Sequence, residues 1–471
     1  MHVRKGAGKI EAHRLLASVQ GMLHQCPAHG GGAGISRCSE STHGKSKDYA
    51  FEMACSNIRF GPGASKEVGQ DLMNMGAKNV CVMVDPNLIP KAPFQAVADS
   101  LTRNRVNFKV FDQVRVEPSD ESMNVAGEFC RQGNFDAYVA VGGGSTIDTC
   151  KVGNLLACDP SADLLKYTNA PIGRGEPINF PLKPLIAVPT TAGTGSETTG
   201  VAVYDYVPLK AKVGIASRAL KPLLGIVDPT HMKTMPNRVA TFSGFDVLCH
   251  ALESFTAIPY NQRSPCPENP ILRPAYQGSN PVSDVWSQHA LKIIQKYFVR
   301  SVENPDDVEA RSQMHLASSY AGIGFGNAGV HLCHGMSYPI SGQVKEYRAR
   351  DYSADHPLIP HGLSVVITAP AVFKFTAPAC PNRHLRAAEL LGSEKAIRAK
   401  ESTAGDILSE VILHYMQRLG IENGLSELGF TNEDIPDLVR GTLPQHRVTK
   451  LSPKPAEDHL SQLLSDSLKV Y

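Results

Sequence analysis

Short apolar runs alternate with spacers of helical length from about residue 56 to residue 229. The runs are continuous rather than alternately polar, which is typical of strands covered on both faces. Apolar strand, helical spacer and apolar strand in succession predict an open parallel α/β sheet. We expect strands at 79–85, 107–111, 137–141 and 185–189.

Beyond about residue 229 the alternation stops, and the apolar positions take a helical period without strand-like runs. Two stretches lack a period: 259–281, which is dense in Pro, Asn and Gln, and 337–360. The pattern predicts an α/β domain over 49–229 and an all-helical domain over 230–471, with a cleft between them. The expected helices are 237–257, 283–300, 306–325, 382–392 and 403–420.

Residues 1–48 differ in composition from the rest of the chain. They hold many Lys and Arg and few acids, a glycine-rich run at 30–34, and one weakly amphipathic segment at 10–23. A basic, acid-poor N-terminus without a long apolar core is typical of a mitochondrial transit peptide. We expect a matrix protein with a transit or disordered segment at 1–48; a non-targeting tail is the alternative.

Composition excludes several classes of protein. Hydrophobic residues make up 42% of the chain and charged residues 20%, as in a soluble globular protein. A net charge of +2 gives no field that would favour nucleic acid. No apolar run reaches the roughly 20 residues of a membrane span. The eleven cysteines are scattered without a framework, which favours a reducing compartment.

Two predicted strands run directly into loops that suit a dinucleotide. Consecutive glycines let the backbone approach a pyrophosphate, and a helix N-terminus favours its charge. Asp85, closing an earlier strand, is a candidate for the adenosine ribose and would favour NAD over NADP. The GxGxxG fingerprint is absent, and a GGGS segment alone is also compatible with a tight turn. The candidate loop residues are Gly142, Gly143, Gly144, Ser145 and Asp148, and Thr190, Thr191, Thr194 and Ser196.

Four side chains form a candidate metal site. Asp246 and His250 are four residues apart, so a helix places them on one face, and His334 and His361 follow downstream. One carboxylate and three imidazoles suit Fe²⁺ or Zn²⁺ and leave room for a substrate oxygen. The alternative for the first pair is a helix salt bridge, because the chain has 17 histidines.

Five motifs in this order resemble the iron-containing (group III) alcohol dehydrogenases. The resemblance covers roughly residues 55–440, and it implies a Rossmann-like dinucleotide-binding domain followed by a helical metal-binding domain, an architecture similar to dehydroquinate synthase. It also implies that Asp246, His250, His334 and His361 hold Fe²⁺, that both glycine loops hold NAD, and that Lys212 lies near it. Members are usually dimers or larger, so a homodimer or a larger homo-oligomer is expected. The motifs are GGGS at 142–145, PTTAGTGSE at 189–197, Asp246-x-x-x-His250, His334-Gly335-Met336 and Pro360-His361-Gly362.

The chain departs from the family pattern at Tyr338. Many members carry a second histidine at this place, four residues after the third ligand. A phenol can also relay a proton, although its reference pKa near 10 makes it a different acid. This variant, the long inserts and the N-terminus resemble an animal mitochondrial branch of the family. That resemblance implies oxidation of 4-hydroxybutyrate to succinate semialdehyde, coupled to reduction of 2-oxoglutarate to 2-hydroxyglutarate through tightly bound NAD.

Such hydroxyacid and 2-oxoacid substrates are anions and need a cation in the cleft. A first alternative is an NAD- and metal-dependent alcohol or hydroxyacid dehydrogenase that releases NADH at each turnover. A second is a non-redox metal lyase of the same architecture, and a third a binding protein without activity. The candidate cations are Arg263, Arg273, Lys345, Arg348 and Arg350.

Overall fold

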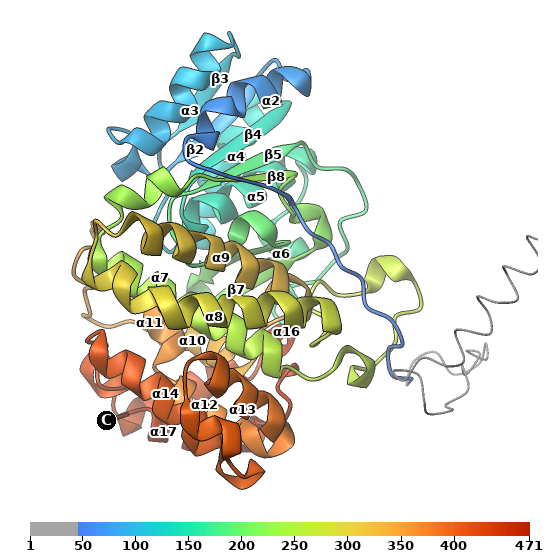
Figure 1. Ribbon diagram of the computed structural model, residues 1–471. Helices are drawn as coiled ribbons and strands as arrows, with labels where there is room; N and C mark the ends of the chain where they lie inside the picture. Colours follow the sequence, from blue (N-terminus) through green and yellow to red (C-terminus); the bar gives the residue numbers. More distant parts are fainter. Residues whose placement is uncertain (1–45) are drawn as a thin grey trace, which may run out of the picture. The chain divides into compact units, whose positions relative to one another are not determined.

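The computed structural model describes residues 46–471 (Figure 1). The helix predicted at 10–23 lies outside these residues, as does most of the predicted segment 1–48. The backbone N–H of Asp48 donates to the carbonyl of Arg263 at 2.8 Å. The Asp48 carboxylate is buried and pairs with Arg263 and Arg273. The end of the predicted segment therefore takes part in the fold.

Six parallel strands form the main sheet, in the order β1-β8-β5-β4-β2-β3. The four strands that the apolar runs predicted are β2, β3, β4 and β5. The patterns missed β1 and β8, which have only four residues each and contain polar residues or a glycine. The strands are β1 (Asn57–Phe60), β2 (Val80–Val84), β3 (Phe108–Phe111), β4 (Ala137–Gly142), β5 (Leu185–Pro189) and β8 (Leu224–Val227).

Both faces of the sheet are covered by helices, which explains why its strands are apolar throughout. Successive side chains of a strand point to opposite faces. Thus Val80, Val82 and Val84 pack with α2 and α3, and Cys81 and Met83 pack with α4 and α5. The helices of this part are α2 (Val68–Asn74), α3 (Ala92–Arg103), α4 (Asp120–Gly133), α5 (Gly144–Cys158) and α6 (Leu164–Tyr167).

A separate antiparallel hairpin was not predicted. Strands β6 (Val201–Tyr206) and β7 (Ala211–Ala216) pair over their full lengths, and Lys210 closes the turn at φ 48°. The hairpin contacts α5 through β6 and α10 through β7. It therefore joins the sheet to the helices that follow, and it carries Lys212.

After β8 no strand occurs in the described chain, and helices of up to 23 residues take over. The five predicted helices are present as α7, α8, α9, α13 and α14. The others are shorter or contain Pro and Gly, and 337–342, predicted as irregular, belongs to α10. None of the helices among residues 46–471 has the length and apolarity to cross a membrane. The helices are α7 (Asn237–Thr256), α8 (Pro281–Glu303), α9 (Val308–Ala328), α10 (Leu332–Gly342), α11 (His361–Val366), α12 (Ala369–Thr376), α13 (Pro381–Leu390), α14 (Ala404–Arg418), α15 (Ile435–Thr442), α16 (His446–Thr449) and α17 (Leu460–Asp466).

The order of the strands places the candidate loops. From β2 the chain moves to β3 on one side and then to β4 on the other, so the direction of winding reverses between β2 and β4. Ligands of open α/β sheets bind beyond the carboxyl ends of the strands at such a point. Asp85 follows β2, and Gly142 ends β4, so both lie at this position.

Candidate active site

Four side chains from three helices converge on one point, and we call them the metal cluster: Asp246 and His250 of α7, His334 of α10 and His361 of α11. The Nε2 atoms of His250 and His334 each lie 3.5 Å from Oδ1 of Asp246, and that of His361 lies 3.8 Å from it. The four ligand atoms all lie within 4.8 Å of one another. The structure therefore brings Asp246 and His250, which are one helical turn apart, together with the two histidines that follow later in the chain.

Close packing of helices fixes this arrangement. A Cβ atom on Gly362 would lie 1.9 Å from the carbonyl oxygen of Phe242, so only glycine lets α11 approach α7 closely enough. The His250 ring stacks on Phe325 of α9, with centroids 3.9 Å apart. Rotation of these imidazoles is thus restricted by neighbouring helices.

The cluster fits a divalent ion. Oδ1 of Asp246 and Nε2 of His334 are buried and have no hydrogen-bond partner among the described residues. Buried polar atoms without a partner are costly and rare. Binding of Fe²⁺ or Zn²⁺ by the carboxylate oxygen and the three imidazole nitrogens would offset this free-energy cost.

Glu253, which the sequence analysis missed, holds the third histidine. Its Oε1 accepts from the backbone N–H groups of His331 and Cys333 at 3.1 and 2.7 Å, and its Oε2 contacts Nδ1 of His334. A partner on Nδ1 leaves Nε2 free to face the cluster. The spacing 246, 250, 253 is a signal that could have revealed it, since all three share one helix face.

Burial and neighbouring charge act in opposite directions on these groups. Burial lowers the pKa of His250 to about 3 and also lowers that of His361, so both imidazoles keep a lone pair free at neutral pH. Burial alone would raise the pKa of Asp246, but the three histidines outweigh it and lower that pKa. Burial would lower the pKa of His334, whereas Glu253 raises it.

The two glycine loops lie against each other at the carboxyl ends of β4 and β5. Gly142 pairs with Pro189, and a Cβ on Gly144 would lie 2.6 Å from Cγ2 of Thr194. The glycines are thus required by packing between the loops as well as by any approach of a ligand. Helix α5 begins at Gly144, so its free N–H groups face the loop region.

Several of the predicted cofactor residues are engaged with each other. Oδ1 of Asp148 accepts from the Ser196 hydroxyl at 2.6 Å, and Oδ2 accepts from the N–H of Val203 at 2.9 Å. Oγ of Ser196 also accepts from buried Lys151 at 2.6 Å. These contacts give Asp148 and Ser196 a role in shaping the loop.

The other predicted cofactor residues do not share one environment. The Ser145 hydroxyl accepts from the N–H of Glu117 at 3.1 Å, and the Thr194 hydroxyl accepts from the N–H of Ser196 at 3.3 Å. Thr190 is buried, and Thr191 faces Gly143. Oδ1 of Asp85 accepts from the backbone and side-chain N–H groups of Asn87, and this carboxylate does not line the cavity beside the metal cluster.

Lys212 is held between two carboxylates. Its Nζ lies 2.9 Å from Asp205 and 2.5 Å from Glu117. Burial would lower the pKa of Lys212, but both carboxylates outweigh it and raise the pKa. Oε1 of Glu117 also accepts from the N–H of His361 at 3.2 Å, so Glu117 links the sheet to α11. The sequence analysis did not single out Glu117, whose φ of 52° is unusual for a side chain of this size.

One cavity of about 100 Å³ brings these parts together. Its lining comes from both glycine loops, the hairpin and helices α7, α9, α10 and α11, so it lies between the sheet and the helical part. The predicted catalytic Tyr338 lies here too, and its hydroxyl accepts from Arg447. The lining includes Gly144, Ser145, Thr194, Lys212, Tyr276 and Tyr338, together with the metal cluster.

Comparison with known proteins agrees with this geometry. The family model for iron-containing alcohol dehydrogenases matches residues 55–229, and the C-terminal model of the same family matches 275–468. The chain is 61% identical over 468 residues to the mitochondrial hydroxyacid-oxoacid transhydrogenase of Rattus norvegicus, and 59% identical over 470 residues to that of Homo sapiens. In both cases 99% of each chain is covered.

Solved structures are similar as well. A 1,3-propanediol oxidoreductase matches with a TM-score of 0.76 at 25% identity, covering 89% of this chain and all of the other. A sulfoacetaldehyde reductase from Bifidobacterium kashiwanohense, solved in complex with NAD⁺, matches with a TM-score of 0.71 at 26% identity, covering 88% and 98%. The full-length match to mitochondrial relatives places this protein in mitochondria. The chain therefore belongs to the iron-containing alcohol dehydrogenase family, and it is an oxidoreductase.

Proposed function

We propose that this protein is a hydroxyacid-oxoacid transhydrogenase. It oxidises 4-hydroxybutyrate to succinate semialdehyde and reduces 2-oxoglutarate to 2-hydroxyglutarate, and NAD stays bound throughout. The full-length relatives, which are hydroxyacid-oxoacid transhydrogenases, support the reaction class. The observation that carries the site is the single cavity that contains the metal cluster, both glycine loops and Tyr338.

The metal cluster would hold Fe²⁺, as the family name suggests, or Zn²⁺. A divalent ion supplies a Lewis acid for a substrate oxygen, and NAD supplies the hydride acceptor and donor. Gly142, Gly143, Gly144 and Ser145 would hold the dinucleotide phosphates with Thr190, Thr191 and Thr194 of the second loop. Asp85, at the winding reversal beside β4, would hold the adenosine ribose.

The chain's own groups would position the reaction and move its proton. Tyr338, one helical turn after His334, would take the hydroxyl proton in one half-reaction and return it in the other. Lys212 would lie beside the dinucleotide, held in place by Glu117 and Asp205. The small size of the cavity would limit the access of water to the reacting carbon. We also propose the division at residues 229 and 230 into a dinucleotide-binding and a metal-binding domain, and assembly as a homodimer or a larger homo-oligomer.

The test is a two-substrate assay on metal-loaded protein without added NAD. With 4-hydroxybutyrate present, we expect succinate semialdehyde to form only when 2-oxoglutarate is also supplied. Formation only after NAD is added, with free NADH accumulating, would make the protein a simple dehydrogenase. The H231Q variant is a matched control, since His231 is a buried histidine beside an aspartate but outside the metal cluster.

A further inference from the structure

The five basic residues that the sequence suggested for the substrate carboxylates are either paired with an acid or lie away from the cavities. Arg263 and Arg273 both pair with the buried carboxylate of Asp48, and Lys345 pairs with Asp434 at 2.8 Å. Arg348 and Arg350 form no ion pair within residues 46–471, but they line neither the cavity of the metal cluster nor the larger cavity that adjoins Tyr276. A different basic residue must meet the anionic substrates of the proposed function.

Arg447 of α16 has the properties of such a residue. Its Nη2 donates to the Tyr338 hydroxyl, whereas Nη1 is enclosed and has no hydrogen-bond partner among residues 46–471. No carboxylate of the described chain forms an ion pair with it. A guanidinium is always charged, and an enclosed charge without a counter-ion is strongly unfavourable. The site is therefore built for an anion that the chain itself does not supply.

Neighbouring residues hold this guanidinium in place. It lies over the rings of Tyr276 and Tyr338, 5.1 and 5.7 Å from their centroids. Gly214 of β7 leaves it space, since a Cβ there would lie 2.9 Å from Nη2. Arg447 is thus fixed by two aromatic faces and a glycine, although its pairing is incomplete.

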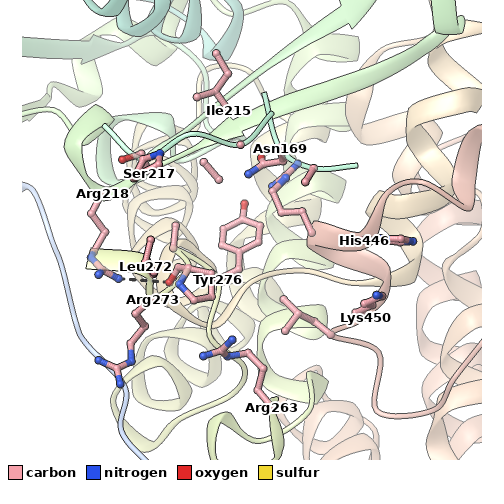
Figure 2. A pocket seen from close by; sticks show the side chains of 18 of the residues that line it. Asn169, Ile215, Ser217, Arg218, Arg263, Leu272, Arg273, Tyr276, His446 and Lys450 are labelled. Carbon is pink, nitrogen blue, oxygen red and sulfur yellow. Dashed lines mark hydrogen bonds between the residues drawn. The ribbon is translucent and has the colours of Figure 1, made fainter. Parts of the chain in front are cut away.

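The location links Arg447 to the reacting centre. Tyr276 and Tyr338 both line the cavity of the metal cluster. Tyr276 and Arg447 also line a larger cavity of about 770 Å³. Figure 2 shows this larger cavity, with Tyr276 in its middle and the basic side chains of Arg218, Arg263 and Lys450 around it. Arg447 therefore lines the basic cavity and directly contacts two tyrosines that line the small one.

The two proposed substrates share a carboxylate at the same distance from the reacting carbon, which a single cation can bind. In 4-hydroxybutyrate the carboxylate carbon is three carbon–carbon bonds from the reacting carbon, and the distal carboxylate of 2-oxoglutarate is equally far from its reacting carbon. From the reacting oxygen to that carboxylate the extended chain spans roughly 5 to 6 Å, from bonds of about 1.5 Å. His334 and Tyr338 are one turn apart, and a helical turn rises about 5.4 Å.

We propose that Arg447 is the specificity-determining residue that binds this shared distal carboxylate in both half-reactions. The inference rests on the proposed function, because the shared carboxylate belongs to its two substrates. Nη1 is the donor left free for the carboxylate, and Nη2 keeps the Tyr338 hydroxyl oriented. One cation at a fixed distance from the metal cluster lets two different acids use one site in turn.

The test compares two acids that differ only at the distal end: 2-oxoglutarate and 2-oxopentanoate, which has a methyl group in place of the carboxylate. Their dissociation constants are measured by calorimetry on the metal- and NAD-loaded protein, which requires no turnover. In the unaltered protein we expect 2-oxoglutarate to bind at least about 100-fold more tightly, as a desolvated charge pair does. In R447Q this ratio falls to within about threefold, and R447K restores part of it.

R218Q is the matched control, because Arg218 lines the same larger cavity but already pairs with Glu52 and contacts the carbonyl of Pro270. It should keep the 100-fold ratio. A ratio that survives in R447Q, or is absent from the unaltered protein, overturns the proposal even if transhydrogenation is observed. Conversely, an Arg447-dependent ratio without transhydrogenation supports the carboxylate site and refutes the proposed reaction. If R447Q does not fold, the ratio in R447K decides, since a merely structural arginine would leave it unchanged.

Discussion

Two buried aspartates, each with a neighbouring histidine, have similar local sequences but different roles in the structure. Asp228 lies beside His231, with 3.7 Å between the carboxylate and the ring, and Asp246 lies 3.5 Å from His250. We call Asp228 with its partners Gly63, Ser65 and Thr230 the structural cluster. Both aspartates are almost completely buried; Asp228 caps the short helical segment Pro229–Thr234, and Asp246 lies in the middle of α7.

The difference lies in hydrogen bonding. The two oxygens of Asp228 accept five bonds, from the N–H groups of Gly63, Ser65 and Thr230 and from the hydroxyls of the last two. Oδ1 of Asp246 accepts none. A satisfied buried carboxylate ties elements together, whereas an unsatisfied one needs a ligand. The same contrast separates Lys151, which has three oxygen partners, from Arg447.

The most severe test of this contrast is D246A. We expect the metal content to fall below one tenth of an ion per chain and the turnover to fall by at least about 10³-fold, because a Lewis acid contributes several kcal/mol. Mass spectrometry of the bound metal and the two-substrate assay measure both. The H231Q control should retain its metal, and equal losses in both variants would contradict the comparison.

Acid should separate the two clusters. Burial would raise the pKa of Asp228, but its hydrogen bonds outweigh it and lower the pKa to about 2 from 3.8. Because the folded pKa is depressed, its contribution to stability is complete above about pH 4 and is lost as the pH falls towards 2. Glu253 raises the pKa of His334, so protons compete with the metal for this imidazole at pH values where Asp228 is still ionised. We expect metal release to begin above pH 4 with circular dichroism unchanged, and simultaneous loss of both signals would refute this.

Removal of the satisfied carboxylate should affect stability and leave metal binding intact. In D228A, buried donors of Gly63 and Ser65 lose their acceptor, so we expect the free energy of unfolding to fall by about 3 kcal/mol. Denaturant unfolding measures the change. The variant should still bind one metal ion per chain, and a metal-free but equally stable protein would reverse the assignment.

A smaller effect is expected from E253Q. The amide keeps the shape of Glu253 but weakens the contact to Nδ1 of His334, and loss of such a partner typically lowers metal affinity by 10- to 100-fold. Competition with a chelator measures the affinity. E346Q is the control, because within residues 46–471 Glu346 forms no ion pair with a residue of the metal cluster.

The smallest effect should come from D85A. Asp85 is half-buried, and its Oδ1 already accepts a hydrogen bond from Asn87. The substitution would therefore remove a single hydrogen bond to the ribose. We expect the dissociation constant for NAD to rise by about 3- to 10-fold, and NADP to bind relatively better because a negative charge is removed. Calorimetry with both dinucleotides checks this, and an unchanged NAD/NADP ratio would remove Asp85 from the site.

The fold could be predicted where local pattern and tertiary environment agree. Strands such as β4 and β5 are buried on both faces and thus apolar throughout, and long helices such as α7 and α8 have a clear period. The prediction failed at β1 and β8, at the β6–β7 hairpin and at α10. Hairpin residues such as Lys212 are polar because they meet the cavity, and α10 keeps Pro339 because neighbouring elements stabilise it.

The sequence by itself determined which chemical groups are available: a carboxylate and an imidazole one helical turn apart, two further histidines, and two glycine loops that follow strands. Helical and strand periodicity act locally, so these features needed no knowledge of the fold. Only the tertiary structure decided which buried groups remain without partners. Pairing depends on residues far apart in the chain, as Asp48 with Arg263, Glu253 with His334, and Arg447 with Tyr338 demonstrate. Function at this site follows from the groups that folding leaves unsatisfied, because burial makes them costly until a ligand binds.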